Sequence, residues 1–238
     1  MDLAALIAAA ASKSGLTVGA DDVVVVAQKI VSKAEGRTAL LSQTYADPQA
    51  LELAAMSGKP ATLARLVLDE ALTVMRATPF AIITRHRTGH VTANSGIDAS
   101  NVVGGDDDTV LLWPRDPDAS ARALRAGLAE QLGAAPAVLI ADSLGRAWRQ
   151  GTLGTCIGCA GLVHTDDRRG QADMFGRTLQ ATIVAVADAL CAMAVLAMGE
   201  GAEGTPVAIV HGAGRWITAE DGDGAAAIMR PVEGDLFP

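Results

Sequence analysis

The chain has 238 residues, of which half are apolar but only 3% are aromatic, and it carries a formal net charge of −8. This length can bury a substantial core, as one large domain or two small interlocked ones, and the acidic balance argues against a nucleic-acid partner. No stretch reaches the roughly 18 apolar residues of a membrane span, and the first residues read as a helix without a basic leader. We therefore expect a cytoplasmic protein that binds neither nucleic acid nor membranes.

The first half of the chain mixes helical and strand patterns. Residues 2–13 predict an Ala-rich helix closed by Gly15, and the β-branched run of residues 23–27 predicts a buried strand. Residues 48–76 carry apolar side chains at helical spacing and predict two helices, broken at residues 58–60. Residues 80–96 predict a hairpin of two strands around a turn at residues 87–89.

The second half continues the mixture. A strand is expected to stop at Pro114, and Asp118 or Ser120 to cap a helix over residues 119–132. Residues 134–142 predict a buried strand that ends at Asp142, residues 178–198 the longest helix of the chain, ended by Gly199, and residues 206–212 a last strand. Hairpins and crossovers both occur, so we predict an α+β fold of mixed sheets and helices.

Residues 28–37, with the sequence QKIVSKAEGR, place cations directly after a strand. Lys29, Lys33 and Arg37 stand around a hydroxyl and a glycine, and the end of a strand is a common place for ligand sites in sheet proteins. A solvated helix start with surface lysines fits the same pattern. The segment is not a phosphate loop of the GxxxxGK[ST] type, and residues 199–204 imitate one only after a helix, where that motif does not belong.

Two further segments place carboxylates after strands. In residues 94–101, NSGIDASN, Asp98 and Asn101 offer hard oxygen ligands for Mg²⁺ or Mn²⁺, although an Asx turn fits as well. In residues 141–151, ADSLGRAWRQG, Asp142 adds a second carboxylate that can converge with Asp98 on one metal. Arg146 and Arg149 can bind anionic oxygens in bidentate fashion, and a surface salt-bridge cluster is the alternative.

The cysteines predict packing, not chemistry. Cys156 and Cys159 form a CxxC pair in a run of small residues, but no second pair completes a zinc site and only a redox role competes with tight backbone packing. With Cys191 the chain has three cysteines, which makes a disulfide framework unexpected. The four histidines are scattered, so nucleophilic hydrolysis has little support.

The segments at residues 28–37, 94–101 and 141–151 resemble the coenzyme F-420-0:L-glutamate ligase family. The resemblance also includes DMFGR at residues 173–177 and MGEG at residues 198–201, and it runs from about residue 23 to residue 214. The resemblance implies the family's unusual α+β arrangement, with residues 1–238 as a single ligase unit whose two copies intertwine as a homodimer. Family members usually carry a strand and loop before the first helix that contribute to the nucleotide pocket, whereas this sequence starts within that helix. We expect no C-terminal flavin-binding domain within these 238 residues.

The resemblance also implies a reaction. The γ-phosphate of GTP would activate the lactyl carboxylate of coenzyme F-420-0 as an acyl phosphate, and the amine of L-glutamate would displace the phosphate to form an amide. The family pattern assigns the divalent cation, Mn²⁺ or Mg²⁺ with K⁺ as an optional addition, to Asp98, Asp142, Ser143 and Glu200. It assigns the GTP site to Gln28, Lys29, Lys33 and Asn101.

Charge alone adds Arg146, Arg149 and Arg177 as partners for the phosphodiester and carboxylates of the acceptor. Asp142, Arg146 and Arg149 are then the expected catalytic residues. Two alternatives remain open at this stage: a ligase of the same fold with another carboxylate acceptor, and a non-catalytic nucleotide-binding protein. Three carboxylates clustered in one site would argue against the non-catalytic alternative.

Overall fold

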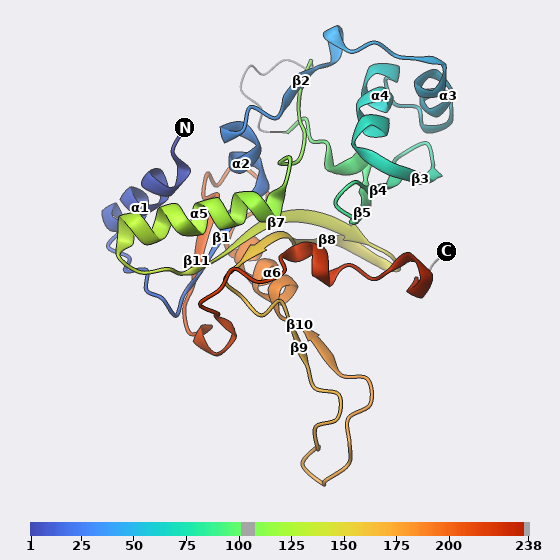
Figure 1. Ribbon diagram of the computed structural model, residues 1–238. Coiled ribbons are helices and arrows are strands. Elements are labelled where there is room, and N and C mark those ends of the chain that lie inside the picture. The colour runs from blue at the N-terminus through green and yellow to red at the C-terminus, as the bar shows by residue number, and fades with distance from the viewer. Residues whose placement is uncertain (101–107, 236–238) are drawn as a thin grey trace. The chain divides into compact units, whose positions relative to one another are not determined.

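The computed structural model describes residues 1–100 and 108–235, and its internal contacts divide the chain into two compact units (Figure 1). Unit 1 contains residues 1–27, 117–143 and 153–238, and unit 2 contains residues 28–116 and 144–152. Each unit combines helices with sheets of its own, so the predicted α+β class is confirmed. Among the helices of the described ranges, none is both long and apolar enough to cross a membrane.

Unit 1 is built on a four-stranded sheet in the order β11-β1-β7-β8. The central strand β1 (Val23–Ala27) runs parallel to β7 (Ala137–Arg146) and antiparallel to β11 (Val207–Val210), while β8 (Arg149–Ala160) forms the other edge. The four valines of β1 are fully buried. A strand covered on both faces reads as a continuous apolar run, which is why the sequence pattern found it.

Helices cover both faces of this sheet (Figure 1). On one face, α1 (Leu3–Lys13) packs on α5 (Pro117–Leu132), closely enough that a Cβ on Gly127 would lie 2.7 Å from the Cβ of Ala4. On the other face, α6 (Val186–Met198) packs against the alternate side chains of β1 and β7. The small residues of β8 allow this, since a Cβ on Gly154 would lie 2.5 Å from the carbonyl oxygen of Cys191.

An arm extends from unit 1 between β8 and α6 (Figure 1). Its base is the antiparallel pair of β9 (Thr165–Asp167) and β10 (Ile183–Ala185). The predicted helix over residues 178–198 is therefore wrong before Val186, because β-branched Ile183 and Val184 pair with β9 instead of continuing the helix. It is also not the longest helix, since α6 has 13 residues and α5 has 16.

Unit 2 contains a three-stranded antiparallel sheet, β3 (Ala71–Ala77), β4 (Ile82–His86) and β5 (Val91–Ala93), and the predicted hairpin is β4 and β5. Its helices are α2 (Gln28–Ala34), α3 (Pro48–Ser57) and α4 (Ala61–Glu70), and β2 (Thr38–Leu40) pairs with β6 (Thr109–Leu111). The helical prediction up to residue 76 is wrong after Glu70, because Thr73 and Val74 favour the strand that pairs with β4.

Two boundaries in the second half of the chain also differ from the prediction. β7 does not end at Asp142 but continues to Arg146, because it forms a hairpin with β8 around Ala147 and Trp148. The helix after Pro114 begins at Pro117, so Asp118 lies in its first turn and is not its cap.

Asp118 instead ties together three segments of unit 1. Its Oδ1 accepts hydrogen bonds from the backbone N–H of Cys159 at 2.9 Å and of Ala225 at 2.7 Å, and its Oδ2 accepts one from Ala226 at 3.2 Å. One carboxylate thereby satisfies backbone donors of β8 and of the C-terminal segment.

Unit 2 has a buried ionic network around Glu70. Arg37 donates to both oxygens of Glu70 at 2.8 Å, Arg87 lies 2.9 Å from Oε2, and the Nε2 atom of His86 lies 3.4 Å from it. Burial acts to raise the pKa of Glu70, but His86, Arg37 and Arg87 outweigh burial and lower the pKa to about 2. Because Arg37 also donates from Nε to the carbonyl oxygen of Trp113, the network fixes the segment that follows α2.

Replacing Asp118 with Ala is expected to lower the free energy of unfolding by about 3 kcal/mol, because buried backbone donors then lose their acceptor. Urea denaturation measures this change. The exposed Asp223 offers a matched control, and Asp223→Ala should change stability by less than about 0.5 kcal/mol. Equal stability of both variants would mean that Asp118 does not hold these segments.

The pKa of Glu70 predicts acid lability. A carboxyl whose pKa is about 2 in the folded chain and near 4.5 in the unfolded chain stabilises the fold above pH 4.5. This contribution, about 3 kcal/mol at neutral pH, is lost as the pH falls from 4.5 towards 2. Unfolding measured across this range should show a steeper loss for the wild type than for Glu70→Gln. Parallel curves for the two proteins would contradict the assignment.

Candidate functional site

In unit 1, Ser143 on β7 contacts Glu200, which follows α6, and Asp142 precedes Ser143 on the strand. Ser143 Oγ donates a hydrogen bond to Glu200 Oε1 at 2.6 Å, and the backbone N–H of Ser143 donates to Asp142 Oδ1 at 2.9 Å. Asp142 and Ser143 are half-buried on β7, whereas Glu200 is exposed. Of the predicted cation ligands, Ser143 and Glu200 are thus in direct side-chain contact, and Asp142 contacts the backbone of Ser143.

The backbone after α6 positions Glu200. The helix ends at Gly199, whose φ of +81° is a conformation that residues with a Cβ rarely adopt. A Cβ at Gly199 would also lie 2.3 Å from the Cδ of Glu203, whose Oε2 accepts from the N–H of Gly201 at 2.8 Å. Glycine is therefore required for the turn that carries Glu200 to Ser143.

In unit 2, Lys29 and Asp98 form a direct ion pair. Lys29 Nζ lies 2.7 Å from Asp98 Oδ2 and donates to Ser100 Oγ at 2.5 Å, while Asp98 Oδ1 accepts from the N–H of Ser100 at 2.6 Å. Burial acts to raise the pKa of Asp98, but the hydrogen bond from Lys29, helped by Ser100, lowers it below its ordinary value. The Asx turn considered as the alternative for this segment exists, and Asp98 has a charged partner in addition.

A left-handed turn presents Asp98. Asn94, Ser95 and Gly96 have φ values of 52°, 52° and 69°. Ser95 is held there because its Oγ donates to the carbonyl oxygen of Val67 at 2.9 Å. Gly96 must lack a Cβ, which would lie 2.3 Å from the ring of Trp113. The NSG part of the motif is thus structural, and it sets where Asp98 points.

Gln28, the first residue of α2, is 2% exposed. Its Oε1 accepts from Ser32 Oγ at 2.9 Å, but its Nε2 has no hydrogen-bond partner among the described residues. Because a buried amide donor without an acceptor costs about 1–3 kcal/mol, this group fits the contact with a ligand oxygen that the family resemblance implies.

The remaining predicted residues lie in different places. Lys33 is half-buried on α2, and Asn101 lies outside the described residues. Arg146 and Arg149 are exposed on either side of the turn between β7 and β8. Arg177 lies in the loop between β9 and β10, where its backbone N–H donates to Asp173 Oδ1 at 2.8 Å.

Asp98 belongs to unit 2 and Asp142 to unit 1, so their convergence on one metal stays a prediction. Within the described parts of the chain, no three Asp, Glu, His or Cys side chains form a ready-made metal site. Arg37, one of the cations singled out in the sequence, pairs with Glu70. In the arm, Arg168 pairs with Asp166 and Arg169 with Asp167.

The CxxC pair is buried on β8, in agreement with the packing prediction. Contact with Cys156, and then burial, raise the pKa of the Cys159 thiol far above its ordinary value. A thiol in this state is a poor nucleophile, so the pair does not resemble a redox site.

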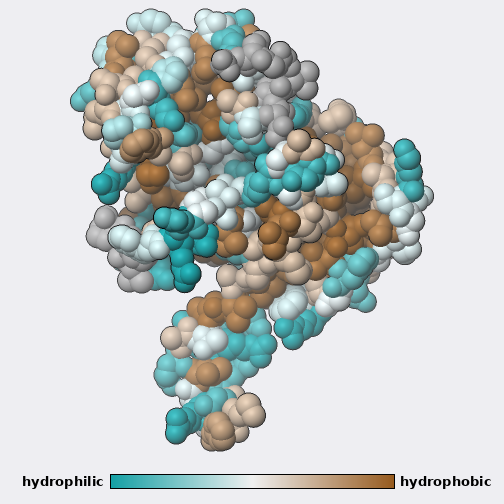
Figure 2. Space-filling view, turned by 180° about the vertical axis from the view of Figure 1, so that it is seen from behind, coloured by the Kyte–Doolittle hydropathy of each residue, from teal (hydrophilic) through white to brown (hydrophobic). Residues whose placement is uncertain are grey.

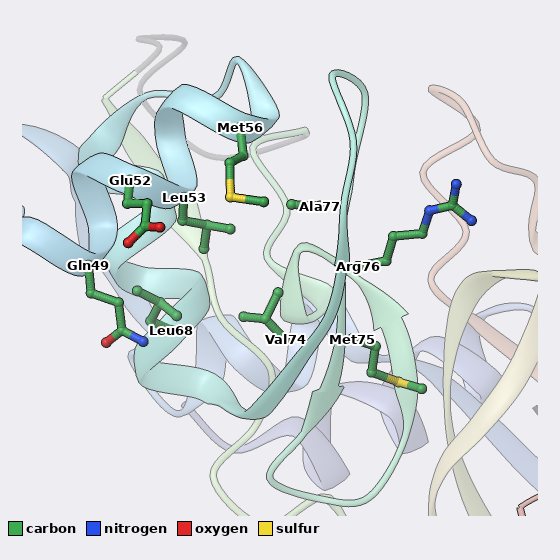
Figure 3. A pocket seen from close by; sticks show the side chains of 9 residues that line it. All are labelled: Gln49, Glu52, Leu53, Met56, Leu68, Val74, Met75, Arg76 and Ala77. Carbon is green, nitrogen blue, oxygen red and sulfur yellow. The ribbon is translucent and has the colours of Figure 1, made fainter. Parts of the chain in front are cut away.

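A pocket of about 350 Å³ lies in unit 2 between α3 and β3 (Figure 3). Leu53, Leu68 and Val74 point into it, whereas Arg76 points away. It contains none of the predicted site residues and is a largely apolar gap between elements.

Sequence reasoning missed Ser100, which completes the contact with Lys29. The signal was present, since a serine two residues after an aspartate commonly joins the same turn. Sequence reasoning also grouped Arg37 with the ligand-binding cations, because its buried partner Glu70 has no signature in the local sequence.

Comparison with known proteins identifies the family. The sequence profile described as F420-0:Gamma-glutamyl ligase matches residues 1–212. A protein of Methanothermobacter thermautotrophicus named Coenzyme F420:L-glutamate ligase is 41% identical over 236 residues, 99% of this chain and 92% of that protein. A protein of the same name from Halobacterium salinarum is 42% identical over 241 residues, 99% of this chain and 88% of that protein.

A third protein of this name, from Methanocaldococcus jannaschii, is 38% identical over 216 residues, 91% of this chain and 84% of that protein. The matched region contains the Ser143–Glu200 group and the Lys29–Asp98 pair. This chain therefore belongs to the F420-0:gamma-glutamyl ligase family.

Proposed function

We propose that this protein is a GTP- and divalent-metal-dependent ligase that joins L-glutamate to the lactyl carboxylate of coenzyme F-420-0. The observation that carries the proposal is the hydrogen bond between Ser143 and Glu200, with Asp142 next to Ser143 on β7. Family membership supports the ligase class and the amino acid, because the relatives are named for glutamate ligation to this coenzyme.

The side-chain oxygens of Asp142, Ser143 and Glu200 fit Mg²⁺ or Mn²⁺. Both cations prefer carboxylate and hydroxyl oxygens, and two carboxylates beside one hydroxyl provide the charge that such a site needs. Asp142, Ser143 and Glu200 would hold the cation, with Asp98 as a further ligand by family resemblance. A bound cation would neutralise charge on the phosphoryl group during its transfer.

Gln28, Lys29 and Lys33 would bind the GTP phosphates. The orphaned Nε2 of Gln28 needs an acceptor, and a phosphate oxygen supplies one. In the unliganded chain Lys29 and Asp98 neutralise each other. GTP gives Lys29 an alternative anionic partner, which releases the carboxylate of Asp98. Nucleotide and cation binding are therefore expected to reinforce each other.

The reaction requires positioning more than covalent catalysis. Transfer of the γ-phosphoryl group to the lactyl carboxylate forms an acyl phosphate, and the glutamate amine attacks its carbonyl carbon and releases phosphate. Arg146 and Arg149 carry charges suited to the phosphodiester and carboxylates of the acceptor.

We also propose the homodimer that the family resemblance implies. The arm supports it, because its end carries Met174 and Phe175 at 96% and 86% exposure and its base exposes Ile183 and Val184. Figure 2 shows brown, hydrophobic patches on the projecting arm at the bottom of the view. Apolar side chains exposed in this way commonly mark a protein interface.

Incubation of the purified protein with F-420-0, L-glutamate, GTP and Mg²⁺ or Mn²⁺, followed by mass spectrometry, tests the proposed reaction. The expected product is heavier than F-420-0 by glutamyl units, and GDP and phosphate appear with it. A folded protein that yields no such product under these conditions would refute the proposal.

Glu200→Gln should weaken Mn²⁺ binding at least tenfold, and the ligase rate with it, because a neutral amide replaces a charged ligand. Glu203→Gln is the matched control, since Glu203 lies in the same loop without contacting Ser143. Metal titration followed by electron paramagnetic resonance measures both variants. Equal Mn²⁺ affinities would remove Glu200 from the site.

Lys29→Gln should raise the Kd for GTP about tenfold or more, because a phosphate contact and its charge are lost. Calorimetric titration provides the measurement, with Lys13→Gln, an exposed residue of α1, as control. Unchanged GTP binding by Lys29→Gln would leave its pairing with Asp98 as a structural contact alone.

A further inference from the structure

The turn between β7 and β8 presents an exposed indole. Ala147 and Trp148 form the turn, and Trp148 is 85% exposed, whereas Trp113 is fully buried. An indole ring is among the largest apolar groups of proteins, so its position at the end of a hairpin requires an explanation.

The backbone at Trp148 is unusual as well. Its φ is +65°, and it occupies the second position of a two-residue turn, where glycine or asparagine is preferred. For a bulky aromatic residue this conformation is an outlier that folding alone does not favour. Such strain is concentrated at sites of function.

Two cationic residues flank Trp148 in the sequence. Arg146 ends β7 and Arg149 begins β8, and both are exposed. Arg146 Nη1 donates to the carbonyl oxygen of Gly151 at 3.3 Å, and within the described residues neither guanidinium has a carboxylate in ion-pair distance. The tip therefore places an exposed aromatic residue between two cationic residues that have no carboxylate partner in the described part of the chain.

This combination is complementary to a planar aromatic ligand that carries phosphate and carboxylate groups. We propose that Trp148 is a binding residue for the acceptor, stacking on its deazaflavin ring while Arg146 and Arg149 bind the phosphodiester. The inference rests on the proposed function and adds to it the residue that recognises the ring. Stacking on an aromatic side chain and bidentate Arg contacts together select an aromatic anion over other carboxylates.

Calorimetric titration of wild type, Trp148→Gly, Trp148→Phe and Arg149→Gln with F-420-0, with the deazaflavin nucleoside that lacks phosphate and lactate, and with GTP separates these contributions. Trp148→Gly should raise the Kd for both deazaflavin compounds at least about fivefold and leave that for GTP unchanged. Trp148→Phe should retain most of the affinity. Arg149→Gln should weaken only F-420-0.

Glycine suits the left-handed turn, so Trp148→Gly should melt at or above the wild-type temperature, which separates lost binding from misfolding. If wild type and Trp148→Gly bind F-420-0 equally, the inference is wrong while the proposed function stands. If the wild type binds no F-420-0, the proposed function itself fails. A smaller sedimenting mass of Trp148→Gly would assign the indole to contact with a second copy and overturn the inference.

Discussion

Charged groups in the interior of a protein require partners, and each unit of this chain contains a carboxylate that has several. Glu70 stays ionised because Arg37 and Arg87 offset its burial, and Asp118 accepts from three backbone N–H groups. Each group connects segments that are distant in the sequence. The same requirement explains the candidate site, where Asp98 is paired with Lys29 and Glu200 with Ser143.

The partners at the site differ from those in the core in one physical respect. Glu70 is 5% exposed, and two of the backbone donors to Asp118 belong to the buried residues Cys159 and Ala225, so exchanging these contacts for solvent or a ligand would be costly. Lys29 and Asp98 are partly exposed, and Glu200 is exposed. Their contacts are therefore weak enough to be replaced by phosphate oxygens and a cation. This difference separates the carboxylates that stabilise the fold from those available for chemistry.

The sequence pattern predicted the helices and strands that their own residues determine. The valines of β1 form a continuous apolar run, and α3 and α4 are separated by Gly58 and Pro60, so these elements were found within a few residues. The errors fall where pairing overrides helical spacing. β3 and β10 are strands because β4 and β9 lie beside them, and β7 passes Asp142 because β8 continues the hairpin. None of these partners is visible in the local sequence.

The candidate site was predictable in part. Asp98 and Asp142 were singled out because both were expected to follow strands, although Asp142 lies within β7. Glu200 was reached only by resemblance, since Ser143 and Glu200 lie 57 residues apart. Lys29 is the counter-ion of Asp98 and also contacts Ser100, which lies 71 residues further along the chain. This role of Lys29 depends on the left-handed turn at Asn94–Gly96. The form of that turn depends on Trp113, which leaves no space for a Cβ at Gly96.

Crystals grown with Mn²⁺ and GTP would test the central claim most directly, because the anomalous scattering of manganese locates the cation without reference to activity. The account predicts a peak within about 2.3 Å of oxygens from Asp142, Ser143 and Glu200. It also predicts that Lys29 has turned from Asp98 to the phosphates. A manganese peak at other residues, with Ser143 still bonded to Glu200 and Lys29 to Asp98, would contradict it.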